Sequence, residues 1–230
     1  MKIPLSDRLL TCCSFVRPGD RVADIGCDHG YLGIHLLKQG IASAVIAADV
    51  NRRPLDSALR NAMKYGTRDK MRFYLSDGAV SIPRDFDVLV CAGMGADTMI
   101  SILTASPWLR EGYRLILQCQ SKTPTLRRWL SEHGCRICRE TLVKDGKFIY
   151  SVMEVDGHLE CPLTPAQWYL SPALLADASV HLPEYYRRIR NGLALNVEGM
   201  RRCGDEQLEV YQDILDQLTQ MEDRIYGNGS

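Results

Sequence analysis

The sequence lacks the features that would place its 230 residues in a membrane or in an oxidising compartment. No apolar run approaches the roughly 20 residues that a membrane-spanning helix needs, and the N-terminus has no secretory signal pattern. Its nine cysteines are odd in number and scattered, which does not indicate a disulfide framework. We therefore expect a cytoplasmic protein with reduced thiols.

A recognisable metal site is also lacking. Cys135 and Cys138 form the only Cys-x-x-Cys pair, and neither a second pair nor a His-x-x-x-His pair follows at zinc-finger spacing. We therefore expect no bound metal, and interpret the two cysteines as small apolar residues on a strand.

The chain also has no net charge, because its 28 basic residues balance its 28 acidic ones. These charges are unevenly distributed along the sequence. Residues 158–230 contain no lysine, six arginines and eleven acidic residues, whereas residues 1–157 hold 22 basic and 17 acidic residues. A polyanionic partner should therefore bind mainly to the first part. Five arginines of the acidic segment are expected to add substrate contacts: Arg187, Arg188, Arg190, Arg201 and Arg202.

The three-glycine motif of dinucleotide-binding folds is missing, but a shorter glycine turn is present. Residues 21–37 predict a buried strand, a turn between Gly26 and Gly30, and a helix. Residues 27–29, Cys-Asp-His, occupy the place of the middle glycine. An acidic turn at a helix N-terminus suits a cationic or zwitterionic ligand better than a pyrophosphate. S-adenosylmethionine fits that description.

Strand and helix patterns alternate along the first 132 residues and are followed by two strands separated by an Asp145-Gly146 turn. This order predicts an α/β fold with a mostly parallel sheet and an antiparallel edge. A helix over residues 4–16 precedes the first strand, with Ser6 as its N-cap. The expected strands cover residues 21–25, 44–48, 71–75, 86–91, 114–117, 135–143 and 147–154.

The pattern changes after Gly157. Prolines punctuate a linker with short helical pieces, and two long amphipathic helical patterns follow, interrupted by Gly204. We predict two domains, residues 1–157 and residues 158–230, the second of them an antiparallel helical hairpin. The apolar stripe residues are interpreted as core contacts without a chemical role: Tyr185, Ile189, Leu193, Val197, Met200, Leu208, Tyr211, Ile214, Leu215, Leu218, Met221 and Ile225.

The segment 24–32, DIGCDHGYL, resembles motif I of class I S-adenosylmethionine-dependent methyltransferases. More narrowly, it resembles the bacterial tRNA (adenine-22-N1)-methyltransferases, whose motif I reads close to DIGSDHAYL. Leu5-Ser6-x-Arg8-Leu9 upstream and Gly93-Met94-Gly95 downstream extend the resemblance, which covers roughly residues 3–155. The implied fold is a Rossmann-like class I methyltransferase sheet with a C-terminal helical hairpin.

The sequence departs from the family pattern in two places. The family has Gly-Met-Gly-Gly where this chain ends in Ala96, and Gln-Pro-Asn where this chain has residues 118–120, Gln-Cys-Gln. Only Gln118 carries over from the second motif, as a candidate for substrate binding. The Asn/Asp-Pro-Pro-Tyr motif of amino-methylating enzymes is absent.

Acidic residues at strand ends are the main candidates for binding the methyl donor. Asp49 lies about 20 residues beyond the glycine turn, where an acid binds ribose hydroxyls in such folds; the alternative is a cap. Asp77, by resemblance, accepts the adenine N6–H, or simply forms an Asp-Gly turn. Asp24 either holds the donor's ammonium group or braces the turn. The full donor-binding set is Asp24, Gly26, Cys27, Gly30, Asp49, Val50, Asp77, Gly78, Ala92, Gly93 and Met94.

Asp28, His29 and Tyr31 are the candidates for catalysis because they follow the first strand at the edge where ligands bind. A purely structural hydrogen-bonding role for His29 is the alternative. Adenine N1 already carries a lone pair at neutral pH, so we expect positioning and an acidic, partly dry pocket rather than a general base.

The resemblance implies methyl transfer from S-adenosylmethionine to N1 of an adenine in tRNA, at position 22, with S-adenosylhomocysteine as the product. tRNA is the expected partner, and we expect a monomer without membrane association. Alternatives are a methyltransferase for another RNA or a small molecule, and an inactive donor-binding scaffold for RNA or a partner. The missing middle glycine disfavours a nucleotide-dependent oxidoreductase.

Overall fold

A seven-stranded sheet forms the centre of the molecule in the computed structural model, which describes residues 3–158 and 161–226. Residues 1–2, 159–160 and 227–230, which belong to the two predicted domains, lie outside the described residues. The strand order is β3-β2-β1-β4-β5-β7-β6, and among these seven strands of the described residues β7 alone runs opposite to the others. The predicted α/β sheet with an antiparallel edge is confirmed. The strands are β1 (Arg21–Ile25), β2 (Ala44–Asp49), β3 (Met71–Leu75), β4 (Val88–Met94), β5 (Arg114–Cys119), β6 (Arg136–Asp145) and β7 (Phe148–Asp156).

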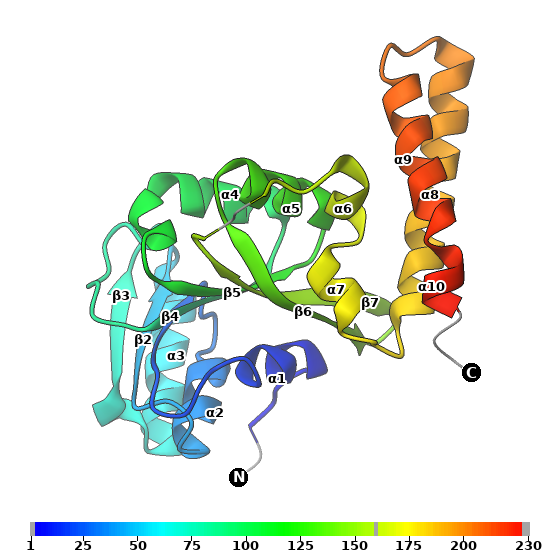
Figure 1. Cartoon of the computed structure of the whole chain (residues 1–230). Coiled ribbons are helices and arrows are strands. Elements are labelled where there is room, and N and C mark those ends of the chain that lie inside the picture. The colour runs from blue at the N-terminus through cyan, green and yellow to red at the C-terminus, as the bar shows by residue number, and fades with distance from the viewer. Residues whose placement is uncertain (1–2, 159–160, 227–230) are drawn as a thin grey trace.

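Helices cover both faces of the sheet (Figure 1). The strands are buried on both faces, as β1 illustrates: Val22 joins the core beneath one helical layer, whereas Ala23 and Ile25 join the core beneath the other. One layer consists of α1 (Asp7–Cys13), α2 (Tyr31–Lys38) and α3 (Arg52–Tyr65). The opposite layer consists of α4 (Ala96–Ala105) and α5 (Thr123–Glu132).

The parallel register brings the carboxyl ends of β1, β2 and β4 to one edge of the sheet. Ile25 pairs with Ala48 on one side and with Cys91 on the other. β4 runs three residues further than expected, to Met94, because a bulge between Ala92 and Met94 preserves pairing with β5. Polar residues that follow these strands are therefore gathered at one place.

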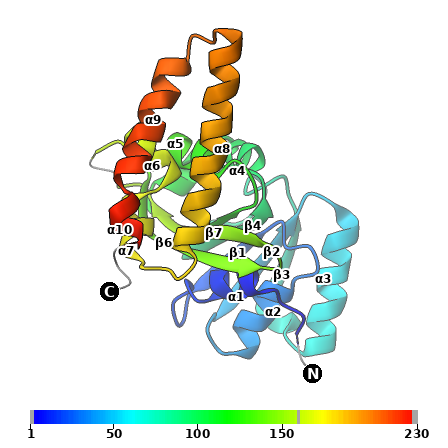
Figure 2. The same cartoon turned by 90° about the vertical axis from the view of Figure 1, so that its right-hand side faces the viewer.

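The C-terminal helices form the predicted antiparallel hairpin, which projects from the body of the molecule (Figures 1 and 2). Gly204, with φ of +71°, ends the first long helix. No helix within residues 3–158 and 161–226 is long and apolar enough to cross a membrane. The C-terminal elements are α6 (Pro165–Tyr169), α7 (Pro172–Ala176), α8 (Leu182–Cys203), α9 (Leu208–Gln220) and α10 (Glu222–Tyr226).

Tyr186 packs more deeply in this hairpin than the stripe pattern predicted. It is 1% exposed and donates a hydrogen bond from its hydroxyl to the carbonyl of Leu218. The cluster that contains it also includes Leu142 of β6, so the hairpin's core continues onto the sheet. The division into two domains after residue 157 stays a prediction.

A buried ion pair ties the C-terminal helices to the sheet. Arg127 of α5 and Glu140 of β6 are both fully buried, with Nη2 and Oε1 2.6 Å apart. The Arg127 Nη1 atom donates to the carbonyls of Trp168 and Tyr169 in α6, at 2.9 and 2.8 Å, and Nη2 donates to the Tyr185 hydroxyl in α8. Glu140 also accepts hydrogen bonds from the hydroxyls of two serines, Ser151 and Ser171.

Removing one partner of this pair should destabilise the fold strongly, because the other charge would remain buried and uncompensated. We expect Glu140→Ala to lower the free energy of unfolding by about 3–5 kcal/mol. Glu132→Ala, which removes an exposed pair with Arg128 on the same helix, is the control and should cost less than about 1 kcal/mol. Urea unfolding followed by circular dichroism measures both, and similar losses in the two variants would contradict the assignment.

Candidate active site

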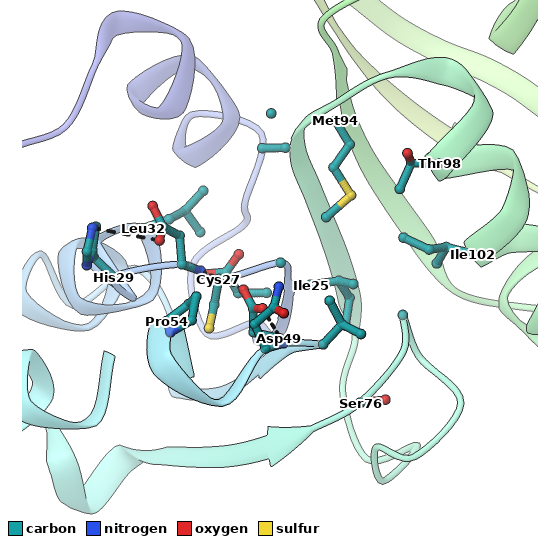
Figure 3. A pocket seen from close by; sticks show the side chains of 18 of the residues that line it. Ile25, Cys27, His29, Leu32, Asp49, Pro54, Ser76, Met94, Thr98 and Ile102 are labelled. Carbon is teal, nitrogen blue, oxygen red and sulfur yellow. Dashed lines mark hydrogen bonds and ion pairs between the residues drawn. The ribbon is translucent and has the colours of Figure 1, made fainter. Parts of the chain in front are cut away.

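A cavity of about 500 Å³ opens at the carboxyl edge of the sheet, where the strand order reverses between β1 and β4. Figure 3 shows His29 and Asp49 on one side of it and Met94 and Ile102 on the other. Most of the residues predicted for donor binding and catalysis line this cavity: Asp24, Gly26, Cys27, Asp28, His29, Tyr31, Asp49, Val50, Asp77, Gly78, Ala92, Gly93 and Met94.

Several predicted site residues do not line it. Gly30 begins α2 with φ of +70°, and an added Cβ would lie 2.9 Å from the Cβ of Ala58, so it serves close packing of α2 on α3. Gln118 is fully buried and lies behind the cavity wall. The five hairpin arginines are on α8, away from the lining.

Other lining residues were not predicted as site residues. Arg8 reaches the cavity from α1, and its only sequence signal was membership of the Leu5-Ser6-x-Arg8-Leu9 motif. Thr98, Ser101 and Ile102 line the cavity from one face of α4, and their three- and four-residue spacing on that helix was the available signal.

The glycine turn has backbone bonds that hold it against β2. The N–H groups of Gly26 and Cys27 both donate to the carbonyl of Ala48, at 2.8 and 3.0 Å. Gly26 has φ of +70°, and a Cβ there would lie 2.1 Å from Cε of Met94. The positive φ favours glycine at this turn, whereas the Met94 methyl group is the end of a flexible side chain and can move aside.

Asp24 is a buried carboxylate with one unpaired oxygen. Its side chain accepts a hydrogen bond from the Gly33 N–H, but its Oδ2 atom has no partner among the described residues. The pKa of Asp24 is raised to about 7, mainly by burial and also by the charge of Asp49, while the Gly33 hydrogen bond acts to lower it. Asp24 lines the cavity, and a ligand ammonium group bound beside it would compensate the charge of its carboxylate.

Asp49 braces the same turn from the end of β2. Its Oδ1 atom accepts from the Asn51 N–H at 2.8 Å and its Oδ2 atom accepts from the Asp28 N–H at 3.3 Å. A carboxylate has about four acceptor positions, so two remain for ligand hydroxyls. From the sequence, ribose binding and a capping role were alternatives for Asp49. The structure makes the two roles compatible, because Asp49 can hold the turn and still accept hydrogen bonds from a ligand.

Asp28 projects into solvent at the cavity mouth. It adopts φ of +48°, its side chain is 68% exposed, and its Oδ1 atom lies 3.7 Å from Nε2 of His29. The His29 and Tyr31 rings follow, with centroids 5.8 Å apart. The mouth is wetter than the partly dry pocket that we expected, so in the free protein water screens the Asp28 charge.

Gln118 orients the β4 turn. Its Oε1 atom accepts two hydrogen bonds, from Nη1 of Arg8 at 2.8 Å and from the Gly93 N–H at 3.0 Å, and its Nε2 atom donates to the Cys119 carbonyl. The Gln118 amide is buried, and both its oxygen and its nitrogen are hydrogen-bonded within the protein. This arrangement favours a role in positioning Arg8 and Gly93 over direct contact with the substrate. Gly93 has φ of +82°, and a Cβ added there would lie 3.0 Å from Nη1 of Arg8.

The cavity is acidic. Four aspartates line it, whereas Arg8 is the only lysine or arginine in the lining formed by described residues. Within residues 3–158 and 161–226, no cluster of three or more histidine, cysteine or acidic residues could hold a metal ion. An acidic cavity with an unpaired buried carboxylate oxygen suits a ligand that carries positive charge, such as a sulfonium with an α-ammonium group.

Comparison with known proteins agrees with this geometry. Residues 5–153 match the family described as methyltransferase domain. A putative tRNA methyltransferase of Mycoplasma pneumoniae is 36% identical over 180 residues, which cover 75% of this chain and 80% of that protein. The tRNA (adenine(22)-N(1))-methyltransferase of Bacillus subtilis is 30% identical over 158 residues, covering 68% of this chain and 66% of that protein.

A solved structure extends the likeness to the C-terminal helices. The crystal structure of a putative tRNA (m1A22) methyltransferase of Streptococcus pneumoniae in complex with S-adenosyl-L-methionine superposes with a TM-score of 0.82 at 26% identity, and the match covers 95% of this chain and 100% of that chain. Together with the match over residues 5–153, this shows that the chain belongs to the class I methyltransferase family, in the group of the tRNA (adenine-22-N1)-methyltransferases.

Proposed function

We propose that this protein transfers a methyl group from S-adenosylmethionine to N1 of adenine 22 in tRNA. The observation that carries the proposal is the acidic cavity at the carboxyl edge, with an unpaired, buried Asp24 oxygen on its wall. The activity named for its relatives supports the choice of substrate. When bound, S-adenosylmethionine supplies an electrophilic methyl group.

Three aspartates divide the recognition of the donor. Asp24 holds the α-ammonium through its unpaired Oδ2 atom. Asp49, at the end of β2, accepts from the ribose hydroxyls with the oxygen lone pairs that the turn amides leave free. Asp77, exposed after β3, accepts from the adenine amino group beside Gly78.

The catalytic contribution of the chain is positioning and charge stabilisation. The target N1 needs no deprotonation before it attacks, whereas the methylated base becomes a cation. Asp28 lies at the mouth of the cavity and supplies negative charge as the cation develops. His29 and Tyr31 hold the base, and the Gly93 backbone allows it to approach the methyl group closely.

The hairpin arginines are less available to tRNA than their number suggests. Arg188 pairs with Glu184 and Arg190 with Glu222, while Arg201 and Arg202 share Glu198. Arg187 is exposed and has no ion pair within the described residues. We assign the strongest hairpin contact with a phosphate to Arg187. The monomeric state and the cytoplasmic location stay predictions.

The function itself is tested on a tRNA transcript with adenine at position 22, incubated with the protein and S-adenosylmethionine. Nucleoside mass spectrometry should detect 1-methyladenosine, and a transcript with guanine at position 22 should remain unmodified. Methylation of another nucleoside would indicate a different RNA site. Donor binding without methylation of any RNA would support the scaffold alternative and overturn the proposal.

The Asp24 carboxyl predicts how donor affinity depends on pH. Its pKa is raised to about 7 in the free protein by burial, and a bound ammonium favours the ionised form. Binding below pH 7 must therefore release a proton, so affinity should rise by up to about tenfold per pH unit between pH 5.5 and 7 and level off above. Calorimetric titration with S-adenosylhomocysteine measures this.

The matched variant for that titration is Asp24→Asn, which keeps an acceptor for the Gly33 N–H but cannot ionise. It should bind more weakly at pH 8 and lose the rise with pH. A wild-type affinity that stays constant from pH 5.5 to 7 would show that Asp24 does not contact the ammonium.

Asp28→Asn separates charge stabilisation from turn geometry, because asparagine also tolerates the positive φ found at this position. Bound tRNA should cover the mouth and lower the local dielectric, so we expect kcat to fall at least about tenfold with donor affinity within twofold of wild type. His29→Ala should lower kcat less than Asp28→Asn does. Any rise of the rate with pH should persist in this variant. Loss of such a rise in His29→Ala would identify a general base and contradict the positioning mechanism.

A further inference from the structure

The turn between β6 and β7 projects past the edge of the sheet that carries the active site. Cys119, the last residue of β5, pairs with Ser151 of β7, so the three preceding residues of β7 extend beyond the end of β5. β6 extends equally far, since Asp145 pairs with Phe148. We call residues 144–148 the β-tip.

The β-tip lies between the active-site cavity and the helical hairpin. On one side, Asp145 is 3.4 Å from Nε of Arg8, which lines the cavity. On the other side, Lys144 is 2.9 Å from Glu184, and Arg188 donates to the carbonyl of Lys147 at 3.1 and 3.2 Å. An RNA that reaches from the hairpin to the cavity by the shortest route would pass over this tip.

Phe148 presents an aromatic ring at the β-tip. It is 51% exposed. Tyr150, two residues along the same face of β7, packs against the core beneath α1. The Phe148 ring lies 6.1 Å from that of Tyr150 and 5.4 Å from the Lys147 ammonium. A half-exposed phenylalanine thus lies beside a cation at the β-tip.

We propose that Phe148 stacks on an unpaired base of the substrate RNA next to the methylated adenine, with Lys147 on the adjoining phosphate. The proposal rests on the function proposed above, because it takes the RNA as the substrate. Exposed aromatic rings flanked by basic side chains are the usual platform for single-stranded nucleotides. A base that is swung out of its stack for methylation leaves its neighbour exposed, and the β-tip is placed to cover that neighbour.

The local charge favours RNA over a protein partner. Four cations, Arg8, Lys144, Lys147 and Arg188, lie in or beside the β-tip, against two acidic side chains, Asp145 and Glu184. Arg8, Lys144 and Arg188 pair with these two carboxylates, which leaves Lys147 without an ion pair among the described residues. This basic surface stands out because residues 158–230 carry almost twice as many acidic as basic residues. An apolar protein interface needs a broad apolar patch, whereas the β-tip offers one aromatic ring with cations beside it. Such a ring suits stacking on a nucleic-acid base.

The experiment compares Phe148→Ala, Phe148→Trp and Tyr226→Ala with wild type. Tyr226 of α10 is the matched control, an aromatic residue that is 48% exposed and lies edge-on to Tyr186. Loss of one stacked base should weaken tRNA binding by about 5- to 150-fold in Phe148→Ala. Phe148→Trp should restore binding, and Tyr226→Ala should leave it unchanged. Donor affinity and melting temperature should stay near wild type in all three.

Salt dependence separates stacking from phosphate contact. The loss in Phe148→Ala should be the same at 50 and 200 mM salt, whereas Lys147→Ala should reduce the slope of log affinity against log salt by about 1. The indole introduced by Phe148→Trp adds a fluorescent reporter at the β-tip. Quenching of its fluorescence by the same tRNA, measured against the wild-type signal, would report the stacked base directly, without requiring methylation.

The outcomes distinguish this inference from the function on which it rests. If wild type methylates adenine 22 and Phe148→Ala binds tRNA as tightly as wild type, only the stacking assignment is overturned. If wild type methylates no tRNA and Phe148→Trp shows no quenching, both fail. Weakened binding that Phe148→Trp does not restore, with a lowered melting temperature, would show that Phe148 only packs the tip.

Discussion

The arrangement of the molecule depends on one buried charge, the guanidinium of Arg127. Burying an unpaired cation would cost more than the fold could supply, so every element that contributes an acceptor to it must be in place together. Glu140 supplies the counter-charge from the sheet, and the remaining acceptors are the carbonyls of Trp168 and Tyr169 in α6 and the Tyr185 hydroxyl in α8. The hairpin is therefore attached by a network that is stable only when complete, which fixes its position relative to the active-site edge.

The proposed donor site would use the opposite principle, a carboxylate left uncompensated until a ligand arrives. The unpaired oxygen of Asp24 has no partner within the described residues, and its raised pKa reflects the cost of ionising it there. A cationic ligand removes that cost, so part of the binding energy comes from relieving an unfavourable state of the protein. Arg8 does not fill this role, because Gln118 and Asp145 engage its guanidinium.

Local sequence patterns predicted the fold and most of the cavity lining well, because strands, glycine turns and strand-end acids are encoded within short windows. The sequence located Asp24, Asp49 and Asp77 for that reason. It could not show that Gln118 is buried, since its burial depends on Arg8 and Gly93, which are 110 and 25 residues away. The Arg190–Glu222 pair escaped for the same reason, because it forms only once two helices have packed. The pairs of Arg188 with Glu184 and of Arg201 and Arg202 with Glu198 are three or four residues apart within α8, so the sequence did carry a signal for them.

The acidic cavity and the RNA surface at the β-tip pose an electrostatic problem, which the distribution of charge resolves. A cavity lined by four aspartates attracts the cationic donor but repels the phosphates of an RNA that must reach it. The basic groups of the β-tip, Lys144 and Lys147, lie outside the cavity lining and offset that repulsion where the RNA backbone would pass. Placing these cations outside the cavity also keeps them away from the positive charge that develops on the methylated base. A chain with no net charge can therefore bind both a cation and a polyanion, because the two fields act at different distances from the reacting atoms.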